Sequence, residues 1–385
     1  MAEWNGIELD GLVLHGGRLT LRPWQASDAP AVQSVMADQR MSAYLPLLPT
    51  PYTAGDAVEF VTEGATVGRE RGSSLDCAVA DNATGELLGS ASLNFPVAGR
   101  TSAEIGYWIA SNHWGRGFAT EATSTLARFG FSAGLNRIQI QCDPRNLASA
   151  RVALRAGFSY EGVARAALSG PDGPCDSALF ARLPGDSGHE VAAASWPGLA
   201  TFTSETAGGS TLTDGVVSLR PVTADDWKTV LDETNNELSR TWGFGGEPLP
   251  DAAARLLAER AGLAWLTGHH LTLLICEAAS GAGAGVLTMR GGGPPDVLGI
   301  GYGLLPEFRG RHFTTRALNL VADWLFSQSS VTRLELGCKV ANVASARAAE
   351  AAGFTRDALF QARLRNPDGS FSDEIGYARI RPGLR

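Results

Sequence analysis

An internal repeat is the feature that most constrains how this chain of 385 residues can fold. The stretch LTLRP at 19–23 returns as VSLRP at 217–221, and IGY at 105–107 returns at 300–302. NLASAR at 146–151 likewise returns as NVASAR at 342–347. The offset between matching stretches stays within 195–198 residues, which excludes coincidence. We therefore predict a duplication, with two domains of ordinary size in place of one large core.

The repeat sets the predicted boundaries, which are a first domain at 1–183, a linker at 184–210 and a second domain at 211–385. The linker is rich in Gly, Ser, Ala and Thr, a composition that suits a connecting segment. Within each copy, short alternating segments predict strands, and the apolar spacing over 119–131 predicts a helix. The expected fold class of each copy is α+β, a mixed, mostly antiparallel sheet flanked by helices.

Charge and residue spacing limit the partners of the chain. The formal net charge is −8, a sign that repels phosphate backbones, so we predict no nucleic-acid partner. No apolar stretch is long enough to cross a bilayer and the N-terminus lacks a secretory signal, so we predict a cytoplasmic protein with no membrane partner. The five cysteines form no CxxC pair and the six histidines show no HxxxH or HExxH spacing, so we predict no metal.

The stretch WGRGFATE at 114–121 carries the sharpest chemical signal. Two glycines let the backbone approach a ligand closely, and the loop opens directly into the predicted helix, whose N-terminal N–H groups attract a diphosphate. The predicted anion cradle consists of Trp114, Gly115, Arg116, Gly117, Phe118, Ala119 and Thr120. A nicotinamide-dependent oxidoreductase is disfavoured, because its fingerprint requires Gly or Ala where Thr120 stands and a different order of elements.

Four ordered motifs resemble those of the GNAT acetyltransferase superfamily, and most closely its ribosomal-protein N-acetyltransferase branch. They are AEIGYWI at 103–109, the glycine loop at 114–121, NxxS at 146–149 and AGF at 156–158. The resemblance covers both halves of the chain outside the linker. The family pattern usually has Gln or Arg where Trp114 stands, but its main contacts are backbone N–H groups.

The resemblance implies roles for individual residues of the first copy. The cradle would bind the pyrophosphate of acetyl-CoA, and the strand centred on Trp108 and Ile109 would bind its pantetheine arm. Asn146 would contact the cofactor and Ser149 would protonate the departing thiolate, although helix N-capping explains both residue types equally. Glu104 is the candidate general base. The alternative for Glu104 is an ordinary exposed carboxylate on a strand, and the alternative base is Asp176.

The second copy departs from this pattern at the glycine loop. It keeps Arg309, Gly310 and Arg311, but His312 replaces the second glycine and either obstructs a phosphate or adds a contact to it. Glycine also stands where the first copy has its candidate base. The remaining candidates are Asn342 for the cofactor and Ser345 and Asp373 for catalysis, with Glu374 beside the last of these. This copy is either an idle pocket or a working site with another acyl-CoA preference.

The leading functional hypothesis is an acyl-CoA-dependent N-acyltransferase that moves acetyl from acetyl-CoA to a primary amine of a small molecule or peptide. No nucleophile stands in a motif, so we expect direct transfer in a ternary complex. In one alternative, one half holds acetyl-CoA structurally while the other catalyses; in another, the chain is a non-catalytic acyl-CoA sensor or scaffold. The oligomeric state is left open between a monomer and a homodimer. Trp24, Tyr44, Tyr52 and Phe60 either shape the acceptor site or belong to the core.

Overall fold

The structure is a computed structural model that divides into two compact units, residues 1–191 and residues 192–385. It describes residues 3–4, 6–42, 45, 48–95, 101–170, 173–186, 211–243, 247–291, 293–366 and 368–384. Of the predicted linker, residues 187–210 lie outside the described residues. Each unit is described below by itself.

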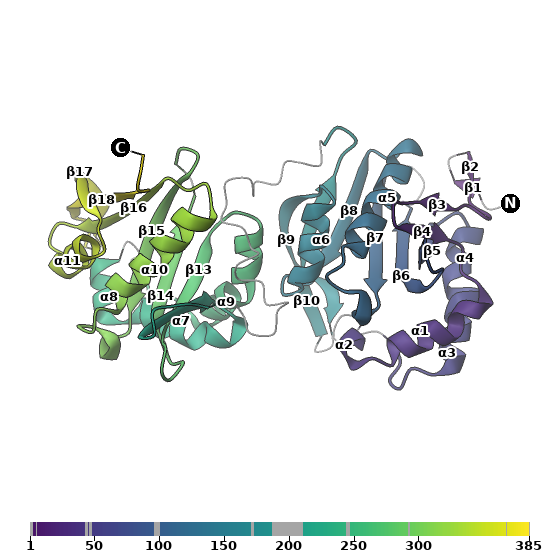
Figure 1. The fold of residues 1–385 in the computed structure, drawn as a ribbon, viewed down its shortest axis with the longest axis horizontal. Helices are drawn as coiled ribbons and strands as arrows, with labels where there is room; N and C mark the ends of the chain where they lie inside the picture. The colour runs from purple at the N-terminus through teal and green to yellow at the C-terminus, as the bar shows by residue number, and fades with distance from the viewer. Residues whose placement is uncertain are drawn as a thin grey trace. The chain divides into compact units, whose positions relative to one another are not determined.

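The N-terminal unit is a sheet covered by helices (Figure 1). Its eight-stranded sheet has the order β3-β4-β5-β6-β7-β8-β10-β9, and β1 pairs with β2 separately. The strands are β1 (Glu3–Trp4), β2 (Ile7–Glu8), β3 (Leu14–His15), β4 (Leu19–Arg22), β5 (Ser74–Asp81), β6 (Leu87–Asn94), β7 (Ser102–Ile109), β8 (Arg137–Cys142), β9 (Ser159–Gly170) and β10 (Gly173–Arg182). The α-helices are α1 (Ala29–Met36), α2 (Gln39–Ser42), α3 (Ala54–Glu59), α4 (Ala65–Glu70), α5 (Phe118–Ser132) and α6 (Leu147–Arg155).

The helix α5 anchors the core of this unit. Phe118, Ala122 and Leu126 recur every four residues, so they share one face of the helix, and all three are buried. This face packs on β6 and β7, and α6 lies beside α5 against β8 and β10 (Figure 1). Because this face of α5 is buried against β6 and β7, the N-terminus of α5 lies close to the C-terminal end of β7. The glycine loop joins these two ends.

The C-terminal unit repeats this architecture (Figure 1). Its sheet has the order β11-β12-β13-β14-β15-β16-β18-β17. The strands are β11 (Leu212–Thr213), β12 (Val217–Pro221), β13 (Leu271–Glu277), β14 (Gly283–Arg290), β15 (Val297–Leu304), β16 (Arg333–Lys339), β17 (Thr355–Arg365) and β18 (Phe371–Ile380). The α-helices are α7 (Trp227–Asn235), α8 (Glu237–Trp242), α9 (Asp251–Leu266), α10 (Phe313–Gln328) and α11 (Val343–Ala351). The predicted α+β class and duplication are confirmed.

One strand pair in each unit breaks the antiparallel pattern. In the N-terminal unit β7 and β8 run parallel, but they pair only over residues 102–104 and 137–139. In the C-terminal unit β15 and β16 are parallel and pair only over 297–299 and 333–335. Because β7 continues to Ile109 and β15 to Leu304, the later part of each strand has one edge that its parallel neighbour does not cover.

Membrane spans and metal clusters are absent from the described residues. No helix there is long and apolar enough to cross a bilayer. No group of His, Cys, Asp and Glu side chains there is arranged to hold a metal ion.

Candidate active site

The glycine loop of the N-terminal unit forms a turn that ends on a helix N-terminus. Gly115 has φ +73° and Gly117 has φ +82°, a left-handed conformation that side-chain-bearing residues rarely adopt. Gly117 is the N-cap of α5, so the N–H groups of the first helical turn lack partners within the helix and are directed toward the loop. The first turn contains the predicted Phe118, which is buried, and Ala119 and Thr120, which are half-buried. The loop can therefore hold an anion.

A side chain ties the loop to the end of β7. Trp114 Nε1 donates a hydrogen bond to the Ile109 carbonyl at 2.6 Å. In the C-terminal unit Arg309 Nε donates to the Leu304 carbonyl at 3.0 Å, at the equivalent place. Trp114 thus replaces arginine as the donor of the same contact, which explains why the loop tolerates this departure.

Two guanidinium groups flank the cradle, and that of Arg18 is paired with the Glu121 carboxylate. Arg116 and Arg18 both lie over the Phe118 ring, at 4.9 Å and 4.8 Å from its centroid. Arg18 Nη1 also donates to the Arg116 carbonyl at 3.0 Å, which fixes the loop between the two glycines. Positive charge beside a helix N-terminus strengthens its attraction for a phosphate.

The uncovered edge of β7 offers backbone groups to an extended ligand. Ala110 N donates to Leu88 O of β6, so alternate residues of β7 direct their backbone groups toward β6. Of the residues between them, Ile105 faces β8 at its last paired position, and Tyr107 and Ile109 direct theirs toward the edge that β8 leaves, where the Ile109 carbonyl accepts from Trp114 Nε1. The predicted Trp108 instead packs its side chain against an aromatic cluster on the sheet.

That cluster contains most of the aromatic residues predicted either to shape an acceptor site or to belong to the core. Trp24 and Phe60 meet edge to face with ring centroids 5.1 Å apart, and Trp24 lies 6.3 Å from Trp108. Tyr52 is partly buried against the same cluster. Tyr44 lies outside the described residues. The cluster places these residues in a core that adjoins β7.

Glu104 lies at the point where β7 and β8 part, since it is the last paired residue of β7. Its Oε2 accepts hydrogen bonds from Gln139 Nε2 at 3.2 Å and Gln141 Nε2 at 3.0 Å. Among the described residues no donor reaches its Oε1. The two amides orient the carboxylate.

Asn146 and Ser149 open α6. Asn146 Oδ1 accepts the Ser149 backbone N–H at 3.1 Å, so Asn146 is the N-cap of the helix. The Ser149 hydroxyl lies 2.8 Å from the Tyr107 hydroxyl of β7. Burial raises the pKa of Tyr107, so its hydroxyl stays protonated and can act as a hydrogen-bond donor. Tyr107 was not predicted as a site residue, although its IGY motif marks both copies.

The loop of the C-terminal unit keeps the same backbone shape. Gly310 has φ +72°, and His312, the N-cap of α10, has φ +61°. His312 therefore adopts the left-handed conformation that glycine adopts in the first copy, at a cost in strain. Arg311 lies over the Phe313 ring at 4.7 Å and pairs with the Glu277 carboxylate. Whether His312 obstructs or contacts a phosphate stays a prediction.

The hydroxyl pair is also repeated in the C-terminal unit. Asn342 Oδ1 accepts the Ser345 backbone N–H at 3.1 Å, and Ser345 Oγ lies 2.8 Å from the Tyr302 hydroxyl. Burial raises the pKa of Tyr302 to about 12. The two units therefore share the loop, the uncovered strand edge and the hydroxyl pair.

The carboxylates differ between the units. Gly299 lacks the side chain of Glu104, and Asp373 Oδ1 accepts the Ala362 backbone N–H at 2.7 Å, which stabilises the β17–β18 hairpin. Asp176 makes the same contact with the Ala166 backbone N–H in the N-terminal unit, at 3.0 Å. These contacts give both aspartates a structural role.

Two other carboxylates approach the sheet of the C-terminal unit where glycines leave space. Glu374 fills the space that a Cβ on Gly337 would need. Glu233 of α7 fills the corresponding space at Gly303 of β15, is 6% exposed and accepts a hydrogen bond from Ser239 Oγ at 2.8 Å. Burial raises the pKa of Glu233. Sequence reasoning missed Glu233, because Gly303 alone does not predict which side chain fills its place.

Comparison with known proteins finds acetyltransferases, and the match to a family model covers both units. The family model of the acetyltransferase (GNAT) domain matches residues 18–159 and 217–355. The chain is 32% identical over 157 residues to the uncharacterized N-acetyltransferase p20 of Bacillus licheniformis, covering 40% of this chain and 85% of that protein. It is 37% identical over 99 residues to the ribosomal-protein-serine acetyltransferase of Escherichia coli K12, covering 26% of this chain and 55% of that protein. Among solved structures it resembles Mycobacterium smegmatis RimJ in complex with CoA-disulfide, with 25% identity, a TM-score of 0.43 and coverage of 48% of this chain and 95% of that chain.

Proposed function

The chain belongs to the GNAT acetyltransferase family, and from this premise we propose that its N-terminal unit binds acetyl-CoA and transfers the acetyl group to a primary amine. The observation that carries the proposal is the loop with Gly115 and Gly117 at positive φ that ends on the N-terminus of α5. The diphosphate of acetyl-CoA would accept hydrogen bonds from the N–H groups of the loop and of the first helical turn. Arg116 would complement its charge, while Arg18, which pairs with Glu121, would hold the loop in place.

The pantetheine arm would lie along the uncovered edge of β7. A peptide-like arm can pair with the backbone groups of Tyr107 and the N–H group of Ile109 as a neighbouring strand would. The fit is supported by the early end of the β7–β8 pairing at residue 104. Acetyl-CoA supplies the activated acetyl group, and the protein supplies its orientation toward the amine.

The residues at the parting of β7 and β8 would handle the protons. Glu104 Oε1 would accept the proton that the amine loses, directly or through one water molecule. The Tyr107–Ser149 pair would donate a proton to the thiolate that leaves. Both roles are supported by position. Glu104 and Tyr107 lie on β7, and the Ser149 hydroxyl lies 2.8 Å from the Tyr107 hydroxyl.

A peptide or protein N-terminus is the favoured acceptor, because the relative from Escherichia coli is named as acting on a ribosomal protein. A small-molecule amine is the alternative. The test is to incubate the full chain with acetyl-CoA and a panel of N-terminal peptides and small primary amines, and to measure CoA release. Amine-dependent release above the rate without amine is expected. Cofactor binding without turnover of any amine would favour a sensor or scaffold.

A second candidate assigns the chemistry to the C-terminal unit, with the N-terminal unit holding acetyl-CoA structurally. The C-terminal unit has no counterpart of Glu104, because Gly299 stands at that position. The observation that favours the second candidate is that two other carboxylates, Glu233 and Glu374, reach the sheet of this unit. Comparing turnover of Glu104→Gln with that of a Glu233→Gln and Ser345→Ala double variant distinguishes the two. Loss in the double variant alone would assign catalysis to the C-terminal unit.

A further inference from the structure

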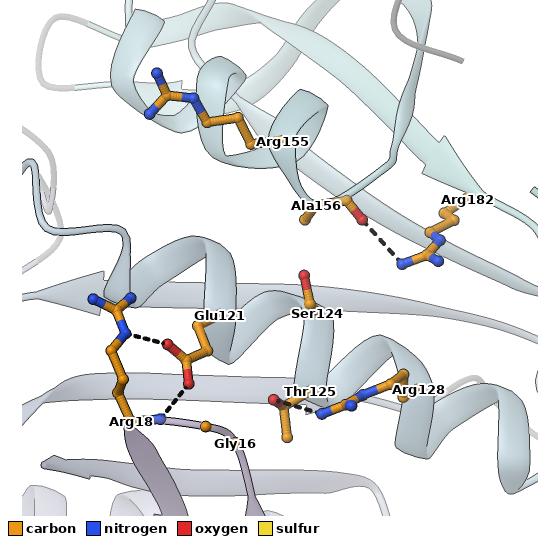
Figure 2. Close-up of a pocket in the computed structure, with 10 residues that line it drawn as sticks. Gly16, Arg18, Glu121, Ser124, Thr125, Arg128, Arg155, Ala156 and Arg182 are labelled. Atoms are coloured by element: carbon orange, nitrogen blue, oxygen red, sulfur yellow. Dashed lines mark hydrogen bonds and ion pairs between the residues drawn. The ribbon is translucent and has the colours of Figure 1, made fainter. Parts of the chain in front are cut away.

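A pocket of about 630 Å³ lies on the outer face of α5 in the N-terminal unit (Figure 2). The turn between β3 and β4, the C-terminus of α6 and the end of β10 complete its walls. Its charged lining residues are Arg18, Glu121, Arg128, Arg155 and Arg182, and Figure 2 shows them surrounding the Ser124 side chain. Arg18 and Glu121 adjoin the glycine loop, whereas Arg128, Arg155 and Arg182 lie outside it.

The charges of this pocket do not balance. Arg18 and Glu121 neutralise each other, with Arg18 Nε 2.9 Å from Glu121 Oε2. In the described part of the chain no carboxylate lies within ion-pair distance of Arg128, Arg155 or Arg182. Arg128 donates only to Thr125 Oγ1, at 3.2 Å, and Arg182 only to the Ala156 carbonyl, at 3.0 Å. The pocket therefore carries an excess of three positive charges in a chain whose net charge is −8.

The C-terminal unit shows that the fold does not need this excess. Asp323 of α10 stands where α5 has Arg128, and it pairs with Arg379, the counterpart of Arg182, at 3.3 Å. Ala351 stands where α6 has Arg155. Since the same architecture forms with a neutralised arginine there, unpaired arginines in the first unit are not a requirement of folding. Arg128 and Arg155 are exposed, so their positive charge is open to a ligand that enters the pocket.

We propose that this pocket binds a phosphate group of a ligand. Guanidinium groups form paired, charge-assisted hydrogen bonds with phosphate oxygens, and the Ser124 and Thr125 hydroxyls can add neutral ones. The phosphate has two sources, the 3′-phosphate of a CoA molecule bound in the adjacent cradle or a separate phosphorylated small molecule. Only the first source rests on the proposed function.

The test compares three probes on the full chain, namely CoA, dephospho-CoA (which lacks the 3′-phosphate) and inorganic pyrophosphate. The pocket variant is Arg128→Gln with Arg155→Gln. Its matched control is Arg71→Gln with Arg165→Gln, which removes the same charge from exposed positions outside the pocket. Arg128→Asp is a second variant, which copies the Asp323–Arg379 pair that the C-terminal unit already tolerates. Calorimetric titration gives each affinity, and thermal unfolding with pyrophosphate gives ligand-dependent stabilisation.

Loss of one or two charge-assisted contacts is expected to weaken phosphate binding about tenfold to a hundredfold. A loss for CoA but not for dephospho-CoA supports the pocket and assigns the phosphate to CoA. If the pocket variants keep the CoA affinity of the parent but are no longer stabilised by pyrophosphate, the result supports a separate phosphorylated ligand. Equal behaviour of parent, pocket variants and control toward all three probes overturns the proposal. If the parent binds pyrophosphate but not CoA, and the pocket variants lose that pyrophosphate binding, the proposed function fails while the pocket stands.

Discussion

If the glycine loop holds a phosphate, a negative charge at residue 117 should weaken acetyl-CoA binding. Replacing Gly117 by Asp and by Asn adds side chains of nearly the same shape, and both residue types tolerate the left-handed φ of +82° better than other side chains do. A Cβ at this position would lie 3.4 Å from Arg18 Nη2, a contact that a flexible side chain can relieve. Both variants should therefore fold, with a strain of about 1 kcal/mol and a midpoint of thermal unfolding lower by about 2–4 °C.

The two variants should differ strongly in affinity for acetyl-CoA. A new carboxylate about 5 Å from a phosphate charge would repel it by about 3 kcal/mol at an effective dielectric constant of about 20. Arg18 would pair with the carboxylate and offset part of this repulsion. We therefore expect Gly117→Asp to bind acetyl-CoA about tenfold to a hundredfold more weakly than Gly117→Asn.

Titration calorimetry of the full chain at low and high salt tests this expectation. The gap between the variants should narrow as salt increases, because the loop is exposed and its charges are screened. Gly11→Asp is the control, since Gly11 also has positive φ, has no neighbour within 4 Å of where its Cβ would stand and lies outside the cradle. Equal affinities for Gly117→Asp and Gly117→Asn would refute the reasoning, because no anion would then be bound beside residue 117.

Three further variants test the site. Glu104→Gln should lower kcat about a hundredfold and leave the Kd of acetyl-CoA unchanged, because a base acts in proton transfer and not in cofactor binding. The control is Glu70→Gln, at an exposed position of α4, and equal kinetics for the two variants would contradict this. His312→Gly should stabilise the chain by up to about 1 kcal/mol through relief of left-handed strain, and a lower unfolding midpoint by calorimetry would show that the imidazole makes stabilising contacts. Burial raises the pKa of Glu233 above its ordinary value of 4.5, so its stabilising contribution is full below that pH and is lost as pH rises through the folded pKa. Glu233→Gln should therefore gain stability relative to the parent as pH rises above the ordinary value of 4.5 in denaturant titrations, and a pH-independent difference would exclude this.

Periodicity and repetition were enough to predict the architecture. The repeat predicted two copies of one topology, and the apolar spacing of α5 predicted the helix that follows the glycine loop. The positive φ of Gly115 and Gly117 follows from residue type, since glycine adopts that conformation at little cost. His312 shows the limit of this reasoning, because its sequence position alone did not reveal that it keeps the same φ.

Contacts between distant segments could not be predicted. The Tyr107 hydroxyl reaches Ser149 across 42 residues, and neither side chain indicates the other in the sequence. Glu233 approaches β15 only because Gly303 leaves room for it, and a glycine carries no information about its neighbour. The arginine pocket is assembled from the β3–β4 turn, α5, α6 and β10, so its charge excess becomes visible only when these segments are brought together.

The two units also differ in how an ion pair ties the first hairpin to the helix after the loop. Arg18 of the turn pairs with Glu121 of α5, whereas Asp214 of the turn pairs with Arg316 of α10 at 2.7 Å, so the polarity is reversed. Each pair is partly exposed and stabilises its unit by about 1 kcal/mol at most. Val216 stands at the place of Arg18, so the two pairs join different residues of the turn to the same position of the helix. Each unit therefore has a neutral contact here, formed by a different residue of its turn. At Arg128 and Arg155 no such pairing exists in the described residues, and the proposed phosphate would neutralise their charge.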